Sequence, residues 1–313
     1  MHTHQQIITL ARLVILTLVP YVLAAQGTML GGRAGVFSIA QEGTMVVSAV
    51  IGFLGAYYTG SLFYGALLAM LAGGLVGLAL AYFTTTLKMN QFVIGLALFF
   101  ATVGLSTLIY KVAIGVTLKP PIIPTLPDIP IPFLSRIPIL GDILFRQNVF
   151  VYFTVLISFL LWYVLYKTGI GLELRAVGEN PLAADSLGIN VTLYRYVTAI
   201  LGGTLMGLAG AYLPMAYTGT FTEDIVRGRG WLSIALTFFG GWAPHTIFFA
   251  SLLFAGIEVF AFRAQVTGVG IPYQFLLMLP YIATILIMIP GFRWAREPAF
   301  LGKNYDREKR GIV

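Results

Sequence analysis

The stretch LFYGALLAMLAGGLVGLALAYF, residues Leu62–Phe83, contains no charged side chain. The hydrocarbon core of a bilayer is about 30 Å thick, and a helix needs roughly 20 apolar residues to cross it. Inside lipid, backbone amides and carbonyls must find partners within the protein, and a helix satisfies them within its own segment. The stretch therefore predicts one membrane-spanning α-helix.

Apolar runs of similar character recur along the whole chain. They are Ile7–Ala25, Thr44–Tyr58, Phe92–Tyr110, Val149–Tyr166, Tyr194–Met215, Trp231–Trp242, Ile247–Phe262 and Tyr273–Ile289. Together they predict an all-α polytopic membrane protein with about 8–10 transmembrane helices. We expect these helices to form a single domain over residues 1–313.

The composition agrees and excludes several classes of protein. Hydrophobic residues make up 58% of the chain and charged residues 10%, whereas a soluble domain carries about 25% charged residues. This balance excludes an ordinary soluble enzyme, a disordered chain and a nucleic-acid-binding domain. The net charge of +7 is instead typical of basic loops that face anionic lipid. The chain has no cysteine and three histidines, so we expect no metal site.

Two glycine-rich segments are too polar or too short to cross the membrane as simple helices. One is Gly27–Gly43, which carries Arg33 and Glu42, and the other is Gly228–Gly241. Transporters use short, glycine-interrupted segments as half-helices at mid-membrane depth. We therefore predict two broken or half-membrane segments, which must lie against protein or a water-filled cavity.

Proline and charge patterns predict which loops share a side of the membrane. The connection over residues 111–148 contains seven prolines, which favour an extended, semi-rigid loop over a helix. Basic residues gather near Lys88, in the connection Lys167–Arg195 and in the tail Arg293–Arg310. The positive-inside rule places these three in the cytoplasm and the proline-rich loop outside.

The polar segment Gly169–Val191 lies between two long apolar runs. Asn180 can cap a helix that begins at Pro181, because asparagine suits the cap and proline the first helical position. Ala183, Ala184 and Leu187 would then form a small apolar face. This pattern fits a short docking helix and a solvated loop equally well.

The same segment resembles the cytoplasmic coupling motif of ABC-importer permeases for branched-chain amino acids, ribose-type sugars and nucleosides. The matching residues are Gly171, Arg175, Ala176, Gly178, Asn180, Ala183, Ala184 and Gly188. Arg33–Met45 resembles the family's "GVxNIGxEGxM" segment, although Ser38 replaces its usual Asn and Ala40-Gln41 its usual Gly-Ala. Gly228–Gly241 resembles the family's glycine-rich broken segment. Ala299–Tyr305 resembles the "ALGxPY" ending of the nucleoside or simple-sugar branch, with Asn304 in place of proline. The resemblance covers roughly residues 28–305.

The resemblance implies the shorter of two paired permeases in the plasma (inner) membrane of a bacterium. Its implied partners are a second homologous permease that forms a heterodimer, an ABC ATPase and an extracytoplasmic substrate-binding protein. The chain has no G-x-x-x-x-G-K-[ST] motif, so ATP and Mg²⁺ would bind the partner ATPase, and we expect no cofactor or enzymatic activity here. Residues 168–193 become the cytoplasmic coupling region and residues 292–313 a cytoplasmic tail. The candidate ATPase contacts are Arg175, Gly178, Glu179, Asn180, Pro181, Ala184, Asp185 and Gly188.

Glu42 is a candidate for the substrate path, because a carboxylate in lipid is costly unless it is paired. It could pair with Arg33, fix the broken segment beside the path, or lie at the headgroups as an anchor. Glu258, in another apolar run, could face a cavity or a partner subunit.

Four further residues in the broken segments are candidates for the path. Ser38 and Gln41 could bind ribose hydroxyls or base edges, or could instead hold helices together. Phe238 and Phe239 could stack on a base, act as a gate, or simply pack.

Two other classes of function compete with an importer of nucleosides or simple sugars. An ion-coupled secondary transporter would need paired ionisable residues in mid-span, for which Glu42 and Glu258 are the available acids. An intramembrane enzyme would need a nucleophile and base or a metal cluster, and no such motif occurs in the sequence. Within the family, a ribose-type sugar or a branched-chain amino acid is the alternative substrate.

Overall fold

The computed structural model describes residues 2–115, 119–267 and 296–307, together with isolated positions between 272 and 286. Over this part the chain is helical apart from its connections and one two-stranded antiparallel pair, β1 (Ile129–Pro130) and β2 (Arg146–Gln147). The expected all-α class is therefore confirmed.

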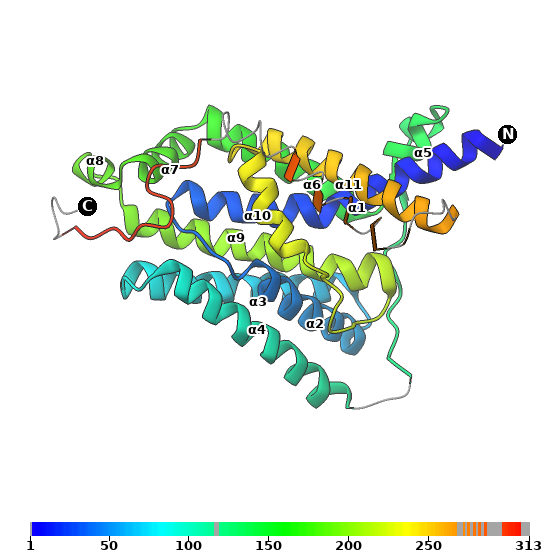
Figure 1. The fold of residues 1–313 in the computed structure, drawn as a ribbon, viewed down its shortest axis with the longest axis horizontal. Helices are drawn as coiled ribbons and strands as arrows, with labels where there is room; N and C mark the ends of the chain where they lie inside the picture. The colour runs from blue at the N-terminus through cyan, green and yellow to red at the C-terminus, as the bar shows by residue number, and fades with distance from the viewer. Residues whose placement is uncertain are drawn as a thin grey trace.

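The long helices follow the apolar runs of the sequence (Figure 1). They are α1 (His2–Arg33), α2 (Gln41–Thr59), α3 (Leu62–Ala81), α4 (Gln91–Ile114), α6 (Val149–Lys167), α9 (Val191–Leu213) and α11 (Pro244–Thr267). Short π-helical turns extend two of them, η1 (Tyr82–Thr86) after α3 and η3 (Pro214–Thr218) after α9. The shorter elements are η2 (Leu134–Arg136), α5 (Leu140–Leu144), α7 (Gly169–Glu179), α8 (Pro181–Ser186) and α10 (Arg229–Phe239).

Six helices in the described part are long and apolar enough to cross a membrane, namely α1, α3, α4, α6, α9 and α11. The predicted span Thr44–Tyr58 forms the largely buried helix α2. The predicted span Trp231–Trp242 forms α10, whose 11 residues reach only about 16 Å. The last predicted span, Tyr273–Ile289, lies largely outside the described residues.

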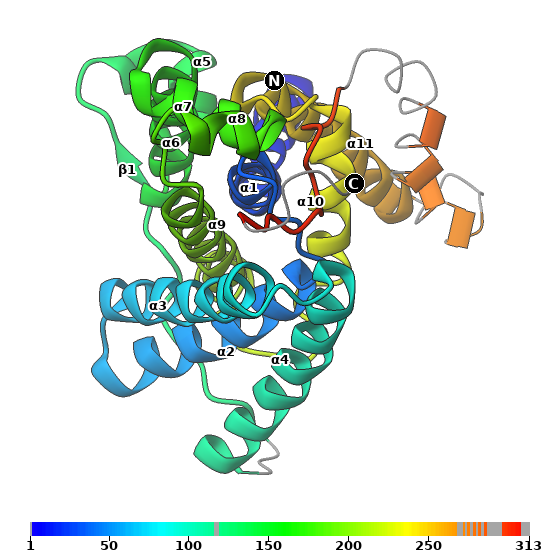
Figure 2. The ribbon, with the colours of Figure 1, turned by 90° about the vertical axis from the view of Figure 1, so that its left-hand side faces the viewer.

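Helix α9 lies at the centre, packed between α1 on one side and α3 on the other (Figure 2). Small residues make this close packing possible, as is usual for helices in lipid. A Cβ atom on Gly73 of α3 would overlap the carbonyl oxygen of Gly203 in α9. A Cβ atom on Gly27 of α1 would come 2.5 Å from the carbonyl oxygen of Gly202.

The loops separate into two ends of the molecule (Figure 1). At one end α7 and α8 meet the tail, where Arg307 Nε lies 3.1 Å from Asp185 Oδ2. Lys88 Nζ joins the same end, 2.6 Å from Asp306 Oδ1. At the other end Arg12 Nη2 of α1 lies 2.6 Å from Asp128 Oδ2 of the proline-rich loop. Within the described residues, the three basic connections share one end of the molecule and the proline-rich loop lies at the other.

The prediction that the proline-rich loop contains no helix is wrong at one place. The loop contains the five-residue helix α5 and the turn η2. Its earlier part is extended and follows η3, where the amides of Ile123 and Leu126 donate to the carbonyls of Gly219 and Met215. Backbone pairing and these ties hold the loop against the ends of the helices.

Candidate functional site

The two broken segments of the sequence meet in the interior of the fold. The first interruption is narrower than predicted, because Gly27–Arg33 complete α1 and Gln41 begins α2. The chain is non-helical over residues 34–40, which we call the first break. The second broken segment is the half-helix α10, which the chain reaches from the proline-rich end through residues 219–228.

Glu42 holds the N-terminus of α10. Its Oε1 accepts a hydrogen bond from the Gly228 amide at 2.8 Å, and its Oε2 accepts one from the Gly230 amide at 2.7 Å. The first amides of a helix have no partner within the helix, and its dipole favours negative charge there. A Cβ atom on Gly230 would overlap the Glu42 backbone, so the glycine permits this approach.

Arg33 holds the opposite end of α10. Its Nε donates to the carbonyl oxygen of Trp242 at 2.8 Å, and its Nη2 lies 3.5 Å from that of Gly241. Carbonyls that follow a helix carry partial negative charge, which a guanidinium offsets. The suggested pair of Arg33 with Glu42 is therefore wrong. The two charges flank the first break and bind the opposite ends of α10, each at the end that the helix dipole favours.

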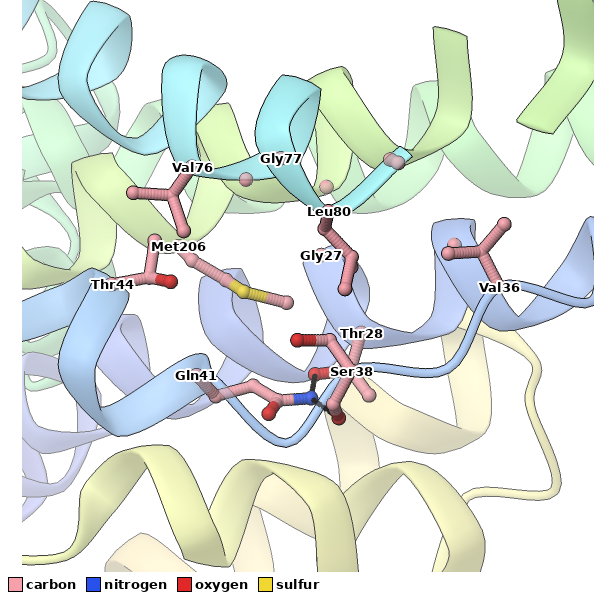
Figure 3. A pocket seen from close by; sticks show the side chains of 14 residues that line it. Gly27, Thr28, Val36, Ser38, Gln41, Thr44, Val76, Gly77, Leu80 and Met206 are labelled. Carbon is pink, nitrogen blue, oxygen red and sulfur yellow. Dashed lines mark hydrogen bonds between the residues drawn. The ribbon is translucent and has the colours of Figure 1, made fainter. Parts of the chain in front are cut away.

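A small cavity of about 20 Å³ lies beside the first break, between α1, α2, α3 and α9 (Figure 3). It has room for about one water molecule. Ser38 and Gln41 line it, as do Thr28 and Thr44, which the sequence reasoning missed. Thr44 follows Gln41 by three positions, so helical spacing alone would have placed both on one face.

Gln41 is the most polar group of this cavity. Its Nε2 donates to the carbonyl oxygen of Ser38 at 2.7 Å and to Thr28 Oγ1 at 3.3 Å (Figure 3). Its Oε1 is buried and accepts no hydrogen bond within the described part of the chain. A buried carbonyl oxygen without a donor is costly, so this atom is available to a water molecule or a polar solute.

Phe238 and Phe239 do not line this cavity. The ring of Phe238 packs edge-on against Phe37 of the first break at a centroid distance of 6.2 Å. It packs likewise against the buried Trp242 at 5.1 Å. The structure thus brings Ser38 and Gln41 together at the cavity and places Phe238 where the first break packs on α10.

Glu258 binds the first residue of α10. Its Oε1 lies 3.2 Å from Arg229 Nη2, and its Oε2 accepts a hydrogen bond from the Tyr21 hydroxyl at 2.8 Å. Within the described residues the second candidate acid is therefore paired inside the subunit, beside the N-terminus that Glu42 also stabilises.

The candidate coupling region, residues 168–193, contains the short helix that the sequence predicted. Asn180 Oδ1 accepts from the Ala183 amide at 3.0 Å, and Pro181 is the first residue of α8. The joint between α7 and α8 touches the end of α1, because a Cβ atom on Gly178 would overlap the carbonyl oxygen of Arg33. The joint therefore contacts the same residue that holds the C-terminal end of α10.

Comparison with protein families gives a match over residues 10–288 to a family described as "Branched-chain amino acid transport system / permease component". The chain belongs to this family. Among the relatives of this permease is the nucleoside ABC transporter permease protein NupC of Lactococcus lactis, 33% identical over 93% of this chain and 94% of the relative.

Two further relatives cover similar shares of the permease. The guanosine ABC transporter permease protein NupQ of Bacillus subtilis is 32% identical over 93% of this chain and 94% of its own. A putative glucose ABC transporter permease of Haloferax volcanii is 30% identical over 91% of this chain and 94% of its own. No solved structure matches the permease.

The candidate coupling residues of the permease divide into exposed and buried groups. Glu179, Asn180 and Gly188 are exposed, whereas Gly178, Pro181 and Ala184 are buried. Arg175 is half-buried, with its guanidinium carbon 5.1 Å from the centroid of the Tyr166 ring, and Asp185 is paired with Arg307 as described above.

The expected apolar face of α8 is wrong. Ala184 points into the protein and is 2% exposed, whereas Ala183 is exposed and Leu187 is 82% exposed. The helix has only six residues, and its packing against α7 and α9 determines which side faces inward.

Proposed function

We propose that this permease is the transmembrane subunit of an ABC importer that translocates nucleosides or related simple sugars. The observation that carries the proposal is the contact between Gly178 and Arg33. It joins a helix pair at one end of the molecule to the residue that binds the half-helix α10. A displacement of that helix pair would be transmitted through Arg33 to the first break, beside the small cavity.

The chain carries no phosphate-binding loop of its own, so the energy would come from a separate ATPase that binds ATP and Mg²⁺. We propose that the end with α7 and α8 faces the cytoplasm and docks this ATPase, in a multi-pass subunit of the inner membrane. Glu179, Asn180, Gly188 and the exposed Leu187 would contact the ATPase. The buried residues Gly178, Pro181 and Ala184 would maintain the packing of the joint between α7 and α8. Arg175 and Asp185 would fix its position through their contacts with Tyr166 and Arg307.

The remaining partners are a second homologous permease and an extracytoplasmic substrate-binding protein that delivers the solute. The subunit would then act as a conduit without enzymatic activity. Because the cavity holds about one water molecule, the path would be closed here, and α1, α3 and α9 would separate from the first break to admit a solute. The hydroxyls and ring atoms of the solute would then form hydrogen bonds with Ser38, Gln41, Thr28 and Thr44.

The nucleoside class is supported by the relatives named for nucleosides and guanosine, at 33% and 32% identity. A simple sugar is the second candidate, supported by the putative glucose permease at 30%. No observation favours an ion-coupled carrier, because Glu42 and Glu258 are both engaged at the start of α10.

The proposal is tested by reconstituting the permease with its partner permease, ATPase and binding protein in liposomes. Uptake of labelled guanosine, uridine, ribose, glucose and leucine is then compared with and without ATP. We expect ATP-dependent uptake of a nucleoside or sugar that also requires the binding protein. Uptake driven by a proton or sodium gradient without ATP contradicts the proposal.

A further inference from the structure

The described part of the tail, residues 296–307, crosses the end of the molecule that carries α7 and α8. We call residues 298–306 the C-terminal strap. The strap binds the coupling joint, since the Phe300 amide donates to the carbonyl oxygen of Gly178 at 2.9 Å. The Ala299 amide lies 3.4 Å from Glu179 Oε2, which adds a second tie to the same joint.

A few residues further on, the strap binds the first break. The Gly302 amide donates to the carbonyl oxygen of Gly35 at 3.2 Å. The carbonyl oxygen of Lys303 accepts from Nη2 of the buried Arg195 at 3.0 Å. One short piece of chain therefore touches both the proposed ATPase-docking joint and the segment that flanks the cavity.

Gln91, the first residue of α4, connects the strap to the first break. Its Oε1 accepts from the Phe37 amide at 2.7 Å, and its Nε2 lies 3.3 Å from the Gly35 carbonyl oxygen. The same Nε2 lies 3.2 Å from both the Lys303 carbonyl oxygen and Asn304 Oδ1. The side chain is 2% exposed, so these bonds are shielded from water.

Asn304 fastens the strap to the turn before α4. Its Nδ2 donates to the carbonyl oxygens of Lys88 at 2.7 Å and Met89 at 2.8 Å. Its Oδ1 meets Gln91. A proline at this position could make none of these side-chain bonds, so the asparagine binds the strap through its own chemistry.

We propose that the C-terminal strap transmits the movement of the α7–α8 joint to the first break, with Gln91 and Asn304 as the positioning residues. This inference rests on the proposed function. Hydrogen-bond networks and packed segments can carry coupling between distant sites. The strap is bonded at both ends within five residues, from Phe300 to Asn304. It runs in parallel with the direct contact between Gly178 and Arg33.

The first test replaces Gln91 by alanine in the reconstituted complex. Uptake per ATP hydrolysed should fall about tenfold, as expected when buried hydrogen bonds are lost, while ATP hydrolysis stays within about twofold of the wild type. Asn304→Ala, at a half-buried position that tolerates truncation more easily, should lower the same ratio.

Gln147→Ala is the matched control. Gln147 is 0% exposed, and its Nε2 donates to the Ile143 carbonyl at the opposite end of the molecule. The Gln147→Ala variant should show the same ratio of uptake to ATP hydrolysis as the wild type. If Gln91→Ala and Asn304→Ala keep the wild-type ratio, or lose uptake and hydrolysis in parallel, the strap has no transmitting role and the inference is overturned.

An engineered disulfide between the strap and the first break tests whether a covalent bond rescues the Gln91→Ala variant. The chain has no cysteine, and a Cβ atom on Gly302 would lie 3.9 Å from Phe37 Cβ, a separation that a disulfide spans. Gly302 has a φ of +71°, so a side chain there is strained, and this strain is present in the oxidised and the reduced protein alike. In a Gln91→Ala chain that also carries Phe37→Cys and Gly302→Cys, oxidation should raise uptake per ATP relative to the same protein after reduction. A complete disulfide that leaves the ratio unchanged contradicts the inference.

Failure of the two proposals can be told apart with the wild-type complex. If the wild type shows no ATP-dependent uptake of any solute, the proposed function fails, and the inference about the strap fails with it. If the wild type transports and the Gln91 variant remains fully coupled, the inference about the strap fails alone.

Discussion

Glu42 and Arg33 show how single charges stabilise the two ends of a short helix. The free amides and carbonyls at the ends of a helix need partners wherever water is scarce, and side chains can supply them. Glu42 bonds two amides at the start of α10, and Arg33 binds carbonyls just beyond its end. Each charge matches the dipole of the helix, a contribution of about 0.3–2 kcal/mol per end.

Glu42→Gln should lower both stability and transport. The new amide group would turn one donor toward a backbone N–H donor, so one hydrogen bond is lost along with the charge. We expect the free energy of unfolding to fall by about 2 kcal/mol. The measurement is unfolding in detergent, followed by uptake in liposomes.

Asp224→Asn is the control for this change. Asp224 is an acid on the same approach to α10, with a highly exposed side chain that pairs weakly with Arg227 at 4.0 Å. Loss of the Asp224 carboxylate should change the free energy of unfolding by less than about 0.5 kcal/mol. Equal effects of the two substitutions would mean that Glu42 does not support α10.

At the scale of helices, the packing of α3 on α9 depends on glycine. The backbones approach so closely that a single methyl group on Gly73 has no space beside Gly203. In lipid, where helices gain little from hiding apolar surface from each other, such close contact supplies the attraction.

Gly73→Ala should therefore destabilise the fold by about 2 kcal/mol through overpacking. Gly104→Ala in α4 is the matched control, because a Cβ atom there meets nothing within 4 Å. Its stability should stay the same or rise slightly, since alanine favours helix. Thermal unfolding of the two variants in one detergent makes the comparison, and similar midpoints would contradict the packing argument.

Leu187, the exposed residue directly after α8, gives a second prediction at this scale. Leu187→Glu should weaken binding of the ATPase about tenfold or more, because a large apolar side chain at an interface is replaced by a charge. Leu144→Glu, at an exposed position in α5 at the opposite end, should leave that binding unchanged. Pull-down of the ATPase with detergent-purified permease gives the measurement, and wild-type binding by the Leu187 variant would exclude this surface.

The whole molecule has two chemically different ends, and this allows its orientation to be tested. Ile122→Cys lies in the proline-rich loop at a position 74% exposed, and Ser186→Cys lies in α8 at an exposed position. In intact cells, a membrane-impermeant maleimide should label the first and not the second. Because the chain has no native cysteine, labelling reports these sites alone. Labelling of residue 186 from outside would show that α8 faces the exterior and would contradict the proposed orientation.

The sequence by itself determined the class of the fold, the positions of most spans and the short helix that begins at Pro181. These features depend on local properties, namely the length of an apolar run and the cap that Asn180 gives the next few residues. It also marked Ser38, Gln41 and Glu42 as unusual, because polar groups in lipid are costly wherever they lie.

Only the tertiary structure decided which groups these residues meet. Arg33 and Glu42 are nine positions apart and of opposite charge, yet each binds an end of α10 about 190–210 residues away. The direction of Ala184 and the path of the C-terminal strap were likewise set by helices distant in the sequence. Unpaired backbone groups arise wherever a helix ends, and which charge reaches them depends on how the helices pack in three dimensions, which local sequence does not encode.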